Sequence, residues 1–336
     1  MRFVRYINTI ETHTEGEPTR IITGGLPAIS GNTMREKRLY MKRNLDNVRT
    51  AVMNEPRGHH NMFGAILTEY VSEDADLGLI FMDGDGYLNF CGHSSIGALT
   101  VAIETGVISP VKPFTKITID TPIGQIKAAA KINDEDEIEY VSVTGLPAFV
   151  FARNVKIVTE NYGEVNLDVA FGGSFVALVN VENLDLNLAG QNAEEIIALG
   201  MEIKDKANKA VEVFHPIYGK TGKIEITELY RRISPDSHHY LNVGIFGHKQ
   251  LDRCPCGTGI CAMMANFYDA GTLDIKEDFV LKSVIGTRFT GRILDKTIIG
   301  NTKGIMPQLK GNAFITGFNQ IVIDPDDPVK YGFRLG

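Results

Sequence analysis

The chain has 336 residues, of which 43% are hydrophobic, and it carries 34 glycines and a formal net charge of −7. Its length is about twice that of a common domain, so we expect two packed units. Basic residues are scattered rather than clustered, which argues against a nucleic-acid or anionic-membrane surface and favours a small-molecule ligand. The N-terminal stretch lacks the apolar segment of a signal peptide, and no run of about twenty apolar residues is present, so a cytoplasmic protein is expected.

The predicted elements, taken in chain order, are short strands alternating with a few helices. The first helix is expected at 34–44, followed by an apolar strand at 77–82 and a turn with a further strand at 84–90. After Cys91, apolar residues recur at helical spacing until Gly106, which should end this helix. The acidic run at 133–137 predicts a solvated loop and a domain boundary, and a further helix is expected at 193–208.

An internal repeat links the two halves of the chain. The stretch CGHSSIGALTVAIETG begins at Cys91, and CGTGICAMMANFYDAG begins at Cys256. Both the first cysteine and the last glycine recur after 165 residues, from 91 to 256 and from 106 to 271. A duplicated strand-rich unit wrapped on one helix explains this repeat. We therefore predict an N-terminal half at 1–132, joined by a C-terminal strand at 313–336, and a second half at 133–312.

The repeat also indicates a chemistry, because it places two thiols at two helix starts. The first turn of a helix exposes backbone N–H groups and a positive dipole end, which should lower the pKa of a thiol and attract a carboxylate. If the halves face each other, one thiolate removes a proton from an α-carbon while the opposite thiol delivers one. No phosphate loop, dinucleotide fingerprint or pyridoxal-type lysine stands out, so no cofactor is expected.

Further roles stay open for the four cysteines of the chain, which are Cys91, Cys254, Cys256 and Cys261. Cys254 and Cys256 could form a redox dithiol, and a dithiol redox or amino-acid-binding protein remains an alternative. A zinc site from Cys254, Cys256, Cys261 and His93 would lack the usual C-x2-C spacing, so no metal is expected. Buried structural thiols are the plainest interpretation of Cys254 and Cys261.

Longer motifs resemble a known family. They are HTEGEPTR at 13–20, NEPRGHHNMFGA at 54–65, FMDGDGYLNFCGHSSIGA at 81–98, FGGSFVA at 171–177, DRCPCGTG at 252–259 and ITGFNQIVIDPDDPVKYGF at 315–333. These blocks resemble the proline racemase family, which includes 4-hydroxyproline epimerases and trans-3-hydroxyproline dehydratases, over nearly the whole chain. The text CPCGTGIC departs from the commoner family pattern, in which serine is more usual at Cys254 and Thr-Ser at Ile260-Cys261.

The resemblance implies a fold and an assembly. The fold is α/β (α+β) and diaminopimelate-epimerase-like, with two pseudo-symmetric halves, each a mostly antiparallel sheet wrapped around a central helix. The resemblance also implies an active site between the halves and a homodimer as the usual assembly.

The resemblance also assigns roles to particular residues. Cys91 and Cys256 are the two acid/base thiols. The substrate carboxylate is bound at Gly92, His93, Gly257 and Thr258, while Asp252 and His93 meet the substrate amine.

Two phenylalanines bear on the choice of substrate within the family. Phe63 and Phe246 resemble the ring pocket of proline racemases, whereas hydroxyproline epimerases tend to carry polar residues near those places. A buried hydroxyl without a partner costs roughly 1–3 kcal/mol, so the two rings favour proline. The sequence thus predicts racemisation of L- and D-proline, with 4-hydroxyproline 2-epimerase as the alternative.

Overall fold

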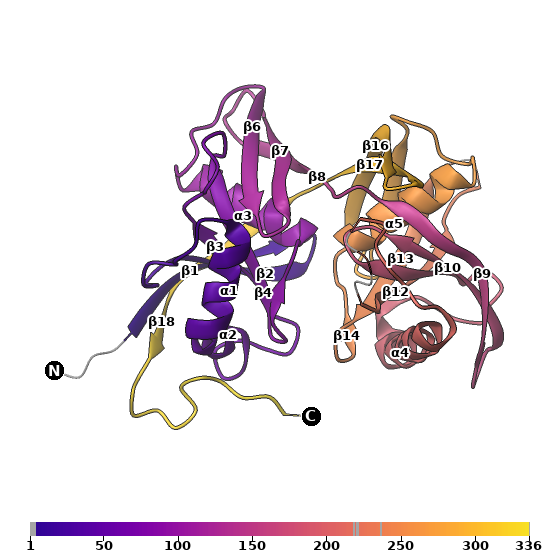
Figure 1. Cartoon of the computed structure of the whole chain (residues 1–336), viewed down its shortest axis with the longest axis horizontal. Helices are drawn as coiled ribbons and strands as arrows, with labels where there is room; N and C mark the ends of the chain where they lie inside the picture. The colour runs from indigo at the N-terminus through magenta and orange to yellow at the C-terminus, as the bar shows by residue number, and fades with distance from the viewer. Residues whose placement is uncertain (1–4, 218, 220–221, 236, 336) are drawn as a thin grey trace. The chain divides into compact units, whose positions relative to one another are not determined.

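The chain divides into two compact units in a computed structural model that describes residues 5–217, 219, 222–235 and 237–335. The first unit comprises Met1–Val143 and Asn312–Gly336, and the second comprises Thr144–Gly311 (Figure 1).

The division lies beyond the acidic segment at which the sequence predicts a boundary. That segment is the exposed turn between β7 (Gly124–Ile132) and β8 (Ile138–Thr144), closed by a 2.9 Å hydrogen bond from the Asn133 N–H to the Glu137 carbonyl. The solvated loop is confirmed. Because β7 and β8 pair as an antiparallel hairpin, with Ala128 opposite Val143, both strands belong to the first unit.

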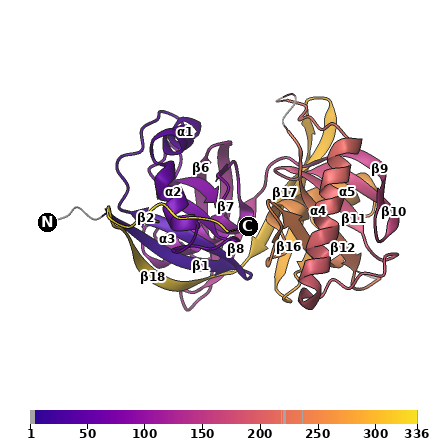
Figure 2. The same ribbon diagram turned by 90° about the horizontal axis from the view of Figure 1, so that it is seen from below.

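The first unit is a mixed sheet in which helices connect the strands of the two parallel pairs. Its other elements are β1 (Arg5–Thr14), β2 (Glu17–Gly24), α1 (Met34–Asn44), α2 (Asp46–Met53), β3 (Phe63–Thr68), β4 (Leu77–Asp83), β5 (Tyr87–Leu88), α3 (Gly92–Glu104), β6 (Phe114–Thr121) and β18 (Ala313–Ile323). The strand order is β18–β1–β2–β3–β4–β6–β7–β8, and β2–β3 and β4–β6 are the parallel pairs. The C-terminal strand β18 runs beside β1 (Figure 2).

Helix α3 is the centre of this unit. It packs against β1, β2, β3 and β18, and every residue from Gly92 to Ile103 is buried. Alanine, serine and glycine let the helix lie close to the strands, so it is enclosed on all sides rather than amphipathic. A side chain at Gly97 would meet Thr12 Oγ1 at 2.9 Å.

The second unit repeats this order of elements. It contains β9 (Phe149–Thr159), β10 (Gly163–Phe171), β11 (Phe175–Asn180), η1 (Gly190–Asn192), α4 (Ala193–Ala210), β12 (Ile224–Arg232), β13 (His239–Phe246), β14 (Gln250–Leu251), α5 (Gly257–Asp269), β15 (Asp278–Lys282), β16 (Arg288–Ile299) and β17 (Thr302–Gly311). The parallel pairs are β11–β12, bridged by α4, and β13–β15, bridged by α5. The buried helix α5 contacts β9, β10, β11, β16 and β17, while α4 covers β12 from the outside (Figure 2).

The predicted helices are confirmed. The helix expected at 34–44 is α1, and that expected at 193–208 is α4. The two repeated helices are α3 and α5, each of 13 residues and each preceded by its cysteine as N-cap residue. The expected strand at 77–82 is β4, but the segment 84–90 contains only the two-residue β5 because most of it forms a turn.

Candidate functional site

Cys91 is the N-cap residue of α3 and lies among polar side chains of the first helical turn. Its Sγ is 3.1 Å from Ser94 Oγ, to which it donates, and 3.4 Å from His93 Nδ1. Cys91 is 7% exposed and Ser94 is fully buried. The first turn therefore supplies the thiol with two polar neighbours, in addition to the backbone N–H groups that a helix start leaves without intrahelical partners.

His93 is held from both sides and stays uncharged. The Thr14 hydroxyl donates to its carbonyl at 2.8 Å, and the Phe63 ring meets the imidazole edge-on with ring centroids 4.7 Å apart. Burial lowers the pKa of His93 to about 3, so the ring is neutral over the physiological range. The predicted residues Cys91, His93 and Phe63 thus lie together in the first unit.

Cys256 is the N-cap residue of α5 and has an unusual backbone. Its φ of 56° lies in the left-handed region, which costs a non-glycine residue about 1–3 kcal/mol and tends to occur at functional sites. The Gly259 N–H donates to its Sγ at 3.3 Å. The sulfur therefore closes the first turn of the helix from the N-cap position.

Two carboxyl groups act on Cys256 and help to raise the pKa of its thiol, whereas the helix start was expected to lower it. Burial, followed by the charges of Glu228 and Asp252, raises the pKa of the Cys256 thiol, and the Gly259 N–H opposes this only in part. The prediction that the helix dipole lowers the pKa of this thiol was wrong. The helix supplies a partial charge, whereas the surroundings remove water and add two acids.

Asp252 is fixed in the turn before the second cysteine. It is 5% exposed, its N–H donates to the Gly244 carbonyl at 2.9 Å, and its Oδ1 accepts from the Cys254 N–H at 3.0 Å. Its carboxyl acts directly on the Cys256 thiol. The structure thus brings Asp252 and Cys256 together in the second unit.

Gly257, Thr258 and Phe246 occupy the surroundings of Cys256. Gly257 and Thr258 form the first turn of α5, where N–H groups have no intrahelical partner. Gly244 lies beside Cys256, because a Cβ at that glycine would be 3.3 Å from its sulfur. Residues two apart on a strand share a face, so Phe246, which is partly buried, points to the same side of β13 as Gly244.

Glu228 lies at the second cysteine but is not among the residues predicted from the sequence. It is fully buried in β12, and Asn242 Nδ2 donates to its Oε1. Asn242 also donates to the Pro255 carbonyl at 3.0 Å, which connects the carboxyl to the turn that carries Cys256. The available signal was an acid in the interior of the apolar segment IEITELY, where a buried charge is rare unless it is paired.

Cys254 and Cys261 are buried, and each of the four cysteines carries a thiol rather than a disulfide. Burial raises the pKa of Cys261 to about 12. Within the described ranges, no group of three or more His, Cys, Asp or Glu side chains is arranged to bind a metal ion. Among the same residues, no helix combines the length and the apolar character needed to cross a membrane.

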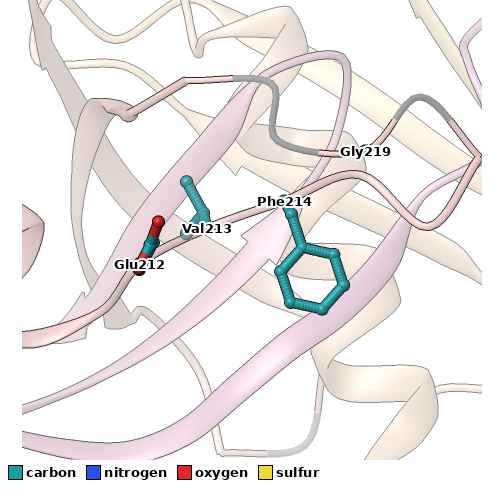
Figure 3. A pocket seen from close by; sticks show the side chains of 4 residues that line it. All are labelled: Glu212, Val213, Phe214 and Gly219. Atoms are coloured by element: carbon teal, nitrogen blue, oxygen red, sulfur yellow. The ribbon is translucent and has the colours of Figure 1, made fainter.

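A pocket of about 300 Å³ lies elsewhere in the second unit, on the segment that follows α4 (Figure 3). It is lined by Glu212, Val213, Phe214 and Gly219. None of these is a predicted site residue, and Glu212 is the only titratable side chain among them. We assign no role to this pocket.

The repeated α/β units, each with a sheet around a helix capped by cysteine, define the diaminopimelate-epimerase-like fold. A solved hydroxyproline epimerase of Agrobacterium vitis, with bound trans-4-hydroxy-L-proline, superposes with a TM-score of 0.91 at 29% identity. The match covers 100% of this chain and 96% of that chain.

Sequence comparison gives the family. The family model described as proline racemase matches residues 9–334. A proline racemase of Acetoanaerobium sticklandii is 45% identical over 336 residues, and one of Clostridioides difficile is 44% identical over 335 residues; each match covers 100% of both chains. The chain belongs to the proline racemase family of isomerases.

Proposed function

We propose that this protein interconverts L-proline and D-proline without a cofactor, with Cys91 and Cys256 acting on opposite faces of the α-carbon. The observation that carries the proposal is the pair of cysteines at the N-caps of two equivalent buried helices, each with a carboxyl or imidazole group beside it. The full-length similarity to proline racemases supports the choice of substrate.

In this proposal, each turnover moves one proton onto and one proton off the substrate. One cysteine, as thiolate, removes the α-proton, and the opposite cysteine, as thiol, delivers a proton to the other face. The first-turn N–H groups at Gly92, His93, Gly257 and Thr258 bind the substrate carboxylate and stabilise the negative charge that develops next to it. The two thiols thereby exchange their protonation states in each turnover.

The substrate amine is proposed to meet Asp252 and His93. A buried carboxylate and a secondary ammonium form a charge-assisted hydrogen bond. Because His93 is neutral, it accepts a hydrogen bond from the ammonium without repelling it. A protonated imidazole at this position would oppose binding of the cationic amine.

A 4-hydroxyproline 2-epimerase with the same two thiols is the second candidate. It is favoured by the close structural match to the hydroxyproline epimerase with bound trans-4-hydroxy-L-proline. The apolar ring of Phe63 beside His93 favours proline, because a phenyl ring does not satisfy a buried hydroxyl. A dithiol redox role for Cys254 and Cys256 gains no support from the burial of both thiols.

The proposed function is tested by proton NMR of L-proline and of trans-4-hydroxy-L-proline in D2O with the reduced protein and no added cofactor. Loss of the α-proton signal together with falling optical rotation is expected on proline. Cys91→Ser and Cys256→Ser should each lower the rate by about 10²–10⁴-fold. A preference for the hydroxylated substrate would establish the epimerase instead, and silence on both substrates would refute the proposal.

We also propose a cytoplasmic homodimer. The side chains of Tyr6, Phe314 and Phe318 are 55%, 57% and 69% exposed on the paired strands β1 and β18, and such exposed aromatics suit a second copy of this chain. Light scattering after size exclusion should give twice the chain mass of 37.0 kDa. A Phe318→Asp variant that remains a dimer would show that this face is not the interface.

A further inference from the structure

The carboxyl group of Glu228 lies next to the Cys256 sulfur. A Cβ placed on Gly244 would lie 3.3 Å from both Glu228 Oε2 and Cys256 Sγ, and one placed on Gly259 would lie 2.1 Å from Oε2 and 3.2 Å from Cys256 Cβ. Two glycines on different elements therefore enclose the same pair of side chains. Glycine at both places leaves the space that the carboxyl occupies.

One oxygen of this carboxyl is satisfied, and the other faces the thiol. Oε1 accepts from Asn242 Nδ2, whereas no nitrogen or hydroxyl donor from the described part of the chain reaches the buried Oε2. An unsatisfied buried acceptor costs about 1–3 kcal/mol, and a buried charge costs more. Such an oxygen is tolerated most readily when it carries a proton and donates it to a neighbour.

The two units differ in what their corresponding strands, β3 and β12, place beside the start of the buried helix. In β3 the ring of Phe63 meets His93 in the first turn of α3. In β12 the carboxyl of Glu228 lies beside Cys256 and Gly259 at the start of α5, and Glu228 pairs with Gly244. The second unit thus has a buried acid at its cysteine, next to a glycine that leaves room for it.

The surroundings of Glu228 determine its ionisation. The neighbouring strands place Leu178 and Gly244 opposite it, and α5 places Gly259 beside it. The titratable groups that influence it are Asp252 and Cys256. Burial raises the pKa of Glu228 to about 8, and the charge of Asp252 adds to this.

We propose that Glu228 is a positioning residue for the second thiol. Its carboxyl and the Cys256 sulfur hold two protons when both are protonated, and after one of these protons is lost they share the one that remains. In the first form of the pair, Oε2 is ionised and the sulfur keeps its proton. In the second form, the proton has moved from Sγ to Oε2, which leaves a thiolate that accepts a hydrogen bond from a neutral carboxylic acid. The net charge of the pair is the same in both forms.

This arrangement gives Cys256 an internal proton partner. Racemisation leaves the two thiols in exchanged protonation states, and a buried thiol exchanges slowly with solvent. With one shared proton, Cys256 can present either the thiolate that removes a proton or the thiol that delivers one, because the carboxyl takes up or returns the proton. The proton that the pair gains or loses in a turnover is afterwards exchanged with solvent. The inference rests on the proposed role of Cys256 in catalysis, but the state of the thiol can be measured without turnover.

The test is the pH dependence of alkylation of Cys256 by iodoacetamide, measured residue by residue with peptide mass spectrometry. A shared proton predicts that the logarithm of the rate rises by one for each pH unit up to about pH 8 and is level above it, because the thiolate fraction of the pair becomes constant. In Glu228→Gln the rate should continue to rise above pH 8 without levelling there, because only the thiol then titrates and burial raises its pKa.

Controls make this result specific. Glu225→Gln removes the same charge from an exposed position of β12 and should keep the wild-type profile. The Cys91 rate, read from the same samples, should be unchanged in both variants. A wild-type rate that rises without levelling, or a Glu228→Gln profile that levels as the wild type does, would overturn the proposal even if proline is racemised. Levelling in the wild type combined with no racemisation would overturn the proposed function alone.

Discussion

Replacing Glu228 by glutamine should remove a strong pH dependence from the stability of this protein. Burial first, and the charge of Asp252 with it, raise the pKa of the carboxyl from 4.5 to about 8 in the folded state. Between these values the folded chain holds a proton that the unfolded chain has lost. The free energy of unfolding therefore falls by about 1.4 kcal/mol for each pH unit in this window.

The free energy of unfolding falls as the pH rises because burial destabilises the charged form of this acid in the folded state. Below pH 4.5 the group is protonated in both states and contributes nothing, and the penalty grows as the pH rises toward 8. Between about pH 5.5 and 7.5 the penalty grows by about 3 kcal/mol. Glutamine has nearly the same shape and can still pair with Asn242, so the variant should lack this part of the pH dependence.

Urea unfolding at the two pH values measures the effect as a difference between proteins. The stability of Glu228→Gln relative to the wild type should increase by about 3 kcal/mol from about pH 5.5 to 7.5, while Glu225→Gln should show no such change. Contributions from histidines cancel in this comparison. A stability difference that is the same at both pH values would refute the reasoning and indicate that the carboxyl is already ionised when buried.

Three further predictions concern the first unit. When the pH falls from about 6.5 to 5, the free energy of unfolding of His93→Asn, measured with urea, should rise by about 2 kcal/mol relative to that of the wild type. The reason is that burial lowers the pKa of the wild-type imidazole from 6.5 to about 3, so in this range only the unfolded wild-type chain takes up a proton. Equal pH profiles of the two proteins would contradict this. Gly97→Ala should lower the free energy of unfolding by about 1 kcal/mol, because the new Cβ would lie 2.9 Å from Thr12 Oγ1 and this overpacking outweighs the helix preference of alanine. An unchanged urea midpoint would show that Thr12 moves aside. Phe63→Ser should raise the rate ratio of trans-4-hydroxy-L-proline to proline by about tenfold, since it offers a hydroxyl partner; a constant ratio would place the ring hydroxyl elsewhere.

The sequence alone determined the parts of this protein that depend on local patterns. The spacing of Ile96, Leu99 and Ile103 after Cys91, and the recurrence of Cys-Gly 165 residues later, were enough to predict α3 and α5. Helical periodicity and N-terminal positions are properties of neighbouring residues, so they can be read without the tertiary structure. The resemblance of long motifs then indicated the fold class and the family.

The tertiary structure decided the electrostatics of the second cysteine. Glu228 and Gly244 lie on different strands, and only the antiparallel register of β12 and β13 brings them opposite each other beside Cys256. A helix start by itself predicts a lowered thiol pKa, but burial and two carboxyl groups raise it. Desolvation depends on everything packed around a group, whereas the helix dipole depends only on the adjacent turn, and for that reason the direction of the shift follows only from the folded structure.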